Sequence, residues 1–103
     1  MAEILKEGSV VTVKPARDIT AQNSADLRQK LRQVYEEGAT RIIIDLEGVG
    51  IIDSIGLGLL AATHNSLLKR ESKLELINAD DNICSVLNLM RLDQHFIISC
   101  ANQ

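Results

Sequence analysis

An acid, a serine and two glycines stand close together in the middle of this sequence and are its best candidates for chemistry. Asp53 and Ser54 are followed by Gly56 and Gly58 in the run Asp-Ser-Ile-Gly-Leu-Gly-Leu-Leu over residues 53–60. A glycine inside a helix costs up to about 1 kcal/mol relative to alanine, so two in adjacent turns need a physical reason. Either they remove side chains from around Ser54 so that another molecule can approach, or they let this segment pack closely against a neighbouring strand.

Ser54 lies where a helix N-cap is expected, ahead of apolar residues that recur every three or four positions from Leu57 to Leu68. The amide groups and the dipole at a helix N-terminus favour an anion. A phosphoserine at this position would add a charge of about −1.5 to −2. The spacing is therefore compatible with a phosphorylated serine that acts as a switch.

Enzyme motifs fit this segment poorly. A nucleophile elbow requires glycine two positions before the serine, and Ile52 stands there. His64 lies about 15 Å along the same helix at 1.5 Å per residue, too far to act as a base for Ser54. The run 56–61 matches a dinucleotide-binding pattern, but that pattern opens its helix directly from a strand in a complete βαβ unit. We predict no catalytic residues; a nucleotide-binding or hydrolytic use of Gly56 and Gly58 is the alternative from another class.

Composition narrows the classes of partner that this chain can bind. The chain has 103 residues, a net charge of −3 and 2% aromatic residues. Single-stranded nucleic acids stack on aromatic rings, and phosphate backbones and anionic lipids attract basic surfaces. The sequence contains neither a secretory signal pattern nor an apolar stretch of about 20 residues. We expect a cytoplasmic protein that binds no nucleic acid and does not insert into a membrane.

The cysteines and histidines do not form a metal-binding pattern. Cys84 and Cys100 have no second pair, and His64 and His95 lack a third ligand at metal spacing. Both cysteines have apolar neighbours, among which a free thiol behaves as a small hydrophobic group. We predict free cysteines, no metal site and no cofactor.

Hydrophobic periodicity and turn residues predict two strands followed by three helix–strand units. Strands are expected at 4–6 and 10–13, joined by a hairpin turn, and then at 41–46, 73–78 and 95–100. Helices are expected from Asn23 as a cap to Gly38, from Ser54 to about Arg70, and from Asp80 or Asp81 to Met90. This order predicts an α/β fold in one domain over residues 1–103, with a mixed sheet and helices packed on it. Because binding sites in such folds gather at the carboxyl ends of strands, the loop 48–54 is the expected site.

Segment 52–60 resembles the signature D-S-[ST]-G-L-G-x-L of the STAS family, the fold of bacterial anti-sigma-factor antagonists. The resemblance extends over nearly the whole chain and includes Val10–Val13, Ala25–Leu27 and Ile43–Leu46. It implies that Ser54 is phosphorylated by a cognate serine kinase that doubles as the anti-sigma factor. The unmodified form would bind this kinase and free the sigma factor, and the phosphorylated form would let go. A phosphatase is a further implied partner.

Three positions depart from the family pattern. Ile55 follows the phosphoacceptor where members commonly have Ser or Thr, and Arg17 and Thr20 replace a glycine and an aspartate in an earlier loop. The predicted function is a non-enzymatic phosphoswitch adaptor. Because some STAS domains serve otherwise, a scaffold or regulatory subunit of a stress-signalling complex or transport system is the alternative. The predicted partner-binding surface comprises Ser54, the phosphoacceptor, with Asp53, Ile55, Gly56, Leu57, Gly58, Asp18 and Thr20.

Overall fold

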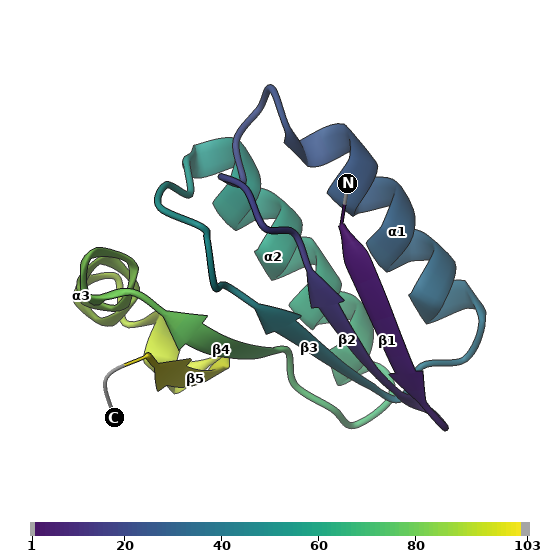
Figure 1. The fold of residues 1–103 in the computed structure, drawn as a ribbon. Helices are drawn as coiled ribbons and strands as arrows, with labels where there is room; N and C mark the ends of the chain where they lie inside the picture. Colours follow the sequence, from purple (N-terminus) through teal and green to yellow (C-terminus); the bar gives the residue numbers. More distant parts are fainter. Residues whose placement is uncertain (1, 102–103) are drawn as a thin grey trace.

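One five-stranded sheet organises the structure, a computed structural model in which residues 2–101 are described (Figure 1). Its strands lie side by side in sequence order: β1 (Glu3–Glu7), β2 (Val10–Lys14), β3 (Arg41–Asp45), β4 (Glu75–Ala79) and β5 (Ile97–Cys100). β1 and β2 form an antiparallel hairpin, and every later pair is parallel. The predicted α/β fold with an N-terminal hairpin and a mixed sheet is confirmed.

Three helices connect the parallel strands. They are α1 (Ser24–Glu36), α2 (Ser54–Leu68) and α3 (Asp81–Leu89), and a short 3₁₀ helix, Leu92–Gln94, precedes β5. α1 and α2 lie next to each other against the sheet (Figure 1). α3 packs against β4 and β5, at the edge of the sheet opposite to β1. Because α1 and α2 each lead back from a parallel strand, both begin at the carboxyl edge of the sheet and run in the same direction.

The core lies between the sheet and these helices. β2 and β3 alternate in burial as strands with one covered face do, so that every second residue is buried. Apolar positions three and four residues apart on α1 and α2 cover that face. The residues with almost no exposure include Val13, Ile42, Ile44, Leu76, Val34, Leu60 and Leu67.

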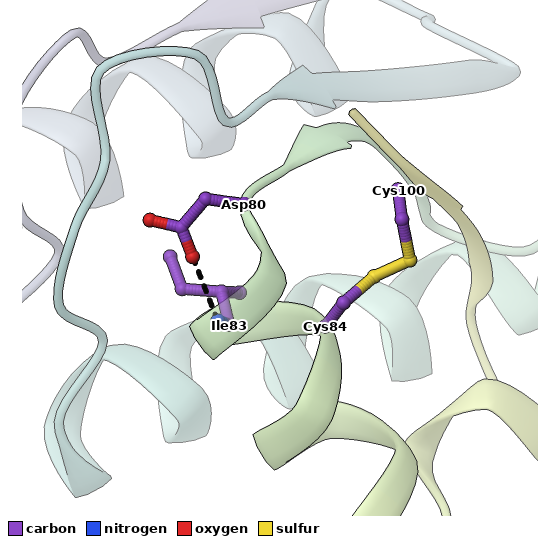
Figure 2. Close-up of a disulfide and its surroundings, with 4 residues drawn as sticks. All are labelled: Asp80, Ile83, Cys84 and Cys100. Atoms are coloured by element: carbon purple, nitrogen blue, oxygen red, sulfur yellow. Dashed lines mark hydrogen bonds between the residues drawn. A yellow bond between two sulfur atoms is a disulfide. The ribbon is translucent and has the colours of Figure 1, made fainter. Parts of the chain in front are cut away.

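The helix ends were predicted with mixed success. Asn23 occupies the N-cap of α1, but its side chain makes no capping hydrogen bond, so the predicted cap is wrong in mechanism. Gly38 follows α1 with φ +102°, a conformation that glycine adopts without strain, as expected for a C-terminal glycine. Asp80 caps α3, because its carboxylate accepts a hydrogen bond from the Ile83 amide at 2.8 Å (Figure 2).

The two cysteines form a disulfide, so the prediction of free cysteines is wrong. Cys84 in the first turn of α3 is bonded to Cys100 at the end of β5, with their Cα atoms 6.0 Å apart (Figure 2). α3 starts directly after β4, and β5 lies beside β4, so the two cysteines meet although they are 16 positions apart. That proximity arises from strand order, which the sequence separation of two cysteines does not reveal.

Candidate functional site

Ser54 lies at the carboxyl edge of the sheet, where the loops that follow β2 and β3 meet. An isolated parallel bridge joins Ile19 of the first loop to Ile52 of the second. The Ile19 amide donates to the Ile51 carbonyl at 2.9 Å, and the Asp53 amide donates to the Ile19 carbonyl at 3.2 Å. These bonds extend the β2–β3 pairing beyond the strands and fix the position at which α2 begins.

Asp18 holds the second loop from the side. One oxygen of its carboxylate accepts hydrogen bonds from the amides of Gly50 and Ile51, both at 3.0 Å. Thr20, two residues later, is half-buried, and its carbonyl accepts from the Asn23 amide at 3.0 Å. The structure therefore places both predicted residues beside the Ser54 loop. Asp18 has a positioning role there that the sequence did not indicate.

Asp53, and not Ser54, is the N-cap of α2. The two oxygens of its carboxylate accept from the Gly56 amide at 2.8 Å and from the Ala21 amide at 2.9 Å. These hydrogen bonds, that from Gly56 first, hold the pKa of the Asp53 carboxyl below its ordinary value. The predicted cap at Ser54 is one residue too late, because the longer reach of the Asp53 carboxylate already satisfies the first turn and the preceding loop.

Ser54 is thereby left as the first helical residue with an exposed side chain. Within residues 2–101 its hydroxyl makes no hydrogen bond, so the fold does not depend on it. Ile55 beside it is 47% exposed and Ile51 is 58% exposed, so two large apolar side chains lie at the surface near Ser54. An unengaged hydroxyl flanked by apolar groups is a surface that another protein can contact.

The two glycines of the segment have different roles. Gly56 is buried, and a Cβ there would overlap the carbonyl oxygen of Ile19 and lie 2.9 Å from the Ile19 Cγ2 atom. Gly58 is exposed, and a Cβ there would meet nothing within 4 Å. Close packing against Ile19 therefore explains Gly56. This glycine affects the surface around Ser54 only indirectly, by allowing α2 to lie close to the loop after β2. No packing requirement explains Gly58.

A groove of about 460 Å³ runs between α1 and α2 and has Ser54 at one end. Arg28, Arg32 and Tyr35 of α1 line one wall. Ser54 and Gly58 lie among the α2 residues of the other wall. The Tyr35 hydroxyl donates to the Ser66 carbonyl at 3.0 Å and joins the helices at the far end. The two arginines recur at the spacing of an ordinary solvent-exposed helix face, and the pairing of α1 with α2 brings them to the site.

A second, smaller hollow lies on the other side of the Ser54 loop. It has a volume of about 180 Å³ and is lined by Ile51, Ile52 and Leu57 on one side and by Val86 of α3 on the other. Leu57, a predicted binding residue, is half-buried and faces this hollow. Ser54 and Ile55 therefore project between an arginine-lined groove and an apolar hollow.

His64 belongs to the core and not to the Ser54 site. It is 6% exposed, its Nδ1 accepts from the Leu74 amide at 3.2 Å, and its ring packs edge-on against Phe96 with centroids 5.0 Å apart. Across the described residues, no cluster of three or more His, Cys, Asp or Glu is arranged to hold a metal ion. None of the helices between residues 2 and 101 has the length and apolar character that crossing a membrane requires.

Comparisons with known proteins give a consistent result. The family model described as the STAS domain matches residues 1–102. The chain is 28% identical over 71 residues to an anti-sigma-B factor antagonist of Staphylococcus aureus (strain NCTC 8325 / PS 47). That match covers 69% of this chain and 66%, just under two thirds, of the relative's length.

Solved structures share the fold. A Thermotoga maritima protein described as an anti-sigma factor antagonist superimposes with a TM-score of 0.88 at 21% identity, covering 95% of this chain and 85% of its own. The Bacillus cell fate determinant SpoIIAA in its phosphorylated form superimposes with a TM-score of 0.75 at 17% identity, covering 95% and 90%. The fold of this chain is therefore shared with these solved structures.

Proposed function

Because the chain belongs to the STAS domain family, we propose that it is an anti-sigma-factor antagonist whose Ser54 surface binds a serine kinase that is also an anti-sigma factor. The observation that carries this proposal is the state of Ser54, an exposed hydroxyl that makes no hydrogen bond within the described residues, at a helix start that Asp53 caps. The relative named an anti-sigma-B factor antagonist supports the general role. In this proposal the protein is a substrate and binding partner, not an enzyme.

The phosphoryl transfer needs only an accessible hydroxyl from this chain. The Ser54 oxygen attacks the γ-phosphorus of ATP held by the kinase, ADP leaves, and a base of the kinase takes the hydroxyl proton. We do not assign Asp53 as that base, because its lowered pKa makes the carboxylate a weaker base and both its oxygens already accept amide hydrogen bonds. Its role is to hold Ser54 in place.

Phosphorylation would break the complex through charge and size. A phosphate adds a charge of about −1.5 to −2 between Ile55 and the groove. If the kinase contacted the apolar side chains there, this charged group would lose its water, which is unfavourable. Because the Ser54 hydroxyl has no hydrogen bond in the described structure to lose, we expect the backbone to stay where it is. A phosphatase would restore binding by hydrolysing the same O–P bond. Because the kinase in this proposal uses ATP, the proposal also implies that the protein acts in the cytoplasm.

The test uses intact mass after incubation with the cognate serine kinase and ATP. Wild type is expected to gain one phosphate, Ser54→Ala none, and the exposed α3 serine variant Ser85→Ala one, as wild type does. Kinase affinity of the phosphorylated protein is expected to fall at least about tenfold, roughly 1.4 kcal/mol. Equal phosphate uptake by wild type and Ser54→Ala would contradict the assignment. Tight binding without any phosphorylation would favour the scaffold alternative.

A further inference from the structure

The groove between α1 and α2 has a charge opposite to that of the protein. The chain carries a net charge of −3, yet the groove is lined by two arginines and no carboxylate. Neither Arg28 nor Arg32 forms a salt bridge within residues 2–101, whereas Lys30 on the same helix is paired with Asp26 at 2.7 Å. Two unpaired arginines one helical turn apart are suited to an anion, because guanidinium groups bind phosphate through parallel hydrogen bonds.

Part of the anion-binding capacity at the start of α2 is already used. The Asp53 carboxylate already accepts from the Gly56 amide, and the Leu57 amide donates to the Asp53 carbonyl at 2.8 Å. The ionised carboxylate also places a negative charge next to Ser54. A phosphate on Ser54 would therefore be stabilised further by nearby positive charge, and the cations that share a cavity with Ser54 are Arg28 and Arg32.

The geometry of the helices brings these groups together. α1 and α2 begin at the same edge of the sheet and run in the same direction (Figure 1). Arg28 lies four residues after the start of α1, and Ser54 is the first residue of α2. Side chains on a helix lean toward its N-terminus, which favours an approach of Arg28 to Ser54. Both arginines line the same groove as Ser54, and Arg32 lies one turn after Arg28.

We propose that the guanidinium groups of Arg28 and Arg32 bind a phosphate that is attached to Ser54 of the same chain. The exposed Gly58 lies one turn below Ser54 on the same wall, and its missing side chain keeps that part of the groove open. The phosphate would bind across the mouth of the groove, neutralise the arginines and join α1 to α2. The unphosphorylated and phosphorylated proteins would then present different surfaces on one unchanged backbone.

This inference assigns a phosphate to Ser54, as the proposed function does, but its test needs no kinase. Phosphoserine is incorporated at position 54 during translation, and its second pKa is measured by ³¹P NMR. The second pKa of phosphoserine lies near 6, and a nearby cation lowers it. In the otherwise wild-type protein we expect a lower value than for phosphoserine placed at position 85, which is exposed on α3 and outside the groove.

Variants of the two arginines decide the proposal. We expect Arg28→Gln with Arg32→Gln to raise the pKa of the phosphoserine by about half a unit, a threefold change in proton affinity. Lys69→Gln at the far end of α2 removes the same kind of charge and is expected to leave the pKa unchanged. An unchanged pKa in the double variant, or an equal change in Lys69→Gln, would overturn the proposal. The kinase assay with wild type and Ser54→Ala is independent of this result, so the two proposals fail separately.

Discussion

The two sides of the first turns of α2 are built on opposite principles. On the inner side, Asp53 is hydrogen-bonded to the backbone of Ile19 and Ala21, and Gly56 lies too close to the Ile19 backbone for any side chain to fit. On the outer side, Ser54 and Gly58 are exposed, and neither has a contact in the described structure that explains its residue type. The inner side fixes the position of the helix and the outer side leaves a surface for another molecule. Gly56 and Gly58, two positions apart, are therefore explained differently: the first by close packing and the second by an open surface.

The largest contrast is expected between alanine substitutions at the two glycines. Gly56→Ala forces the Ile19 backbone to move, and we expect a loss of about 3 kcal/mol in the free energy of unfolding. Gly58→Ala meets nothing and removes a helix glycine, so we expect a gain of up to about 1 kcal/mol. Urea denaturation of both variants measures the difference. Equal losses would show that both glycines are packing residues and would remove the distinction between the two sides.

Gly58→Ala also bears on function. If the open groove matters for kinase binding, the variant is expected to be more stable and yet to bind the kinase more weakly. Undiminished binding would mean that the absence of a side chain at Gly58 serves no contact with that partner.

The second contrast is between Asp53 and Ser54. Asp53→Ala removes the N-cap of α2 and a bond to the Ala21 amide, and we expect the Tm to fall by about 5 °C. Ser54→Ala removes a hydroxyl that makes no hydrogen bond in the described structure, and the Tm is expected to change by less than about 1 °C. Scanning calorimetry of the two variants distinguishes these outcomes. A large loss in Ser54→Ala would mean that the serine caps the helix after all.

The same contrast explains which parts of the site the sequence could predict. Strand and helix periods, turn glycines and the Asp53–Gly58 motif located the elements and the candidate serine, because these are local signals. Asp53 and Gly56 have partners on the loop after β2, and Asp18 of that loop has partners on the loop after β3. Each partner is more than 30 positions away in sequence, and the parallel pairing of β2 with β3 brings the two loops together. The capping error at Ser54 has the same origin, since only the folded loop shows which side chain reaches the Gly56 amide.

Residues brought together by two different helices were harder still to predict. Arg28 and Arg32 repeat at the spacing of an ordinary exposed helix face, and nothing in α1 alone relates them to Ser54. The Cys84–Cys100 disulfide likewise depends on β5 lying beside β4. A hydrophobic pattern predicts that a helix packs against the rest of the protein. Which element it packs against, and which polar residues meet at that contact, depends on the strand order.

The smallest expected effect concerns His64, a buried residue in the middle of α2. Burial first, with like charge from His95 and Lys73, keeps the pKa of His64 below its ordinary value of 6.5. As the pH falls below about 6.5, the unfolded chain therefore binds a proton that the folded chain refuses, and stability declines until the lowered pKa of the folded state is reached. Protonation of Nδ1 would also remove the acceptor of the Leu74 amide.

Denaturation of wild type and His64→Asn between pH 7.5 and about 5 tests this expectation, because the asparagine carbonyl still accepts a hydrogen bond. We expect the decline to be clearly smaller in His64→Asn and only slightly smaller in His95→Gln, because burial, and not the like charge of His95, is the main cause of the lowered pKa of His64. Parallel curves for wild type and His64→Asn would show that other groups cause the acid sensitivity. In that case the inner side of α2 would differ from the groove side in packing alone, without a contribution from a buried titratable group.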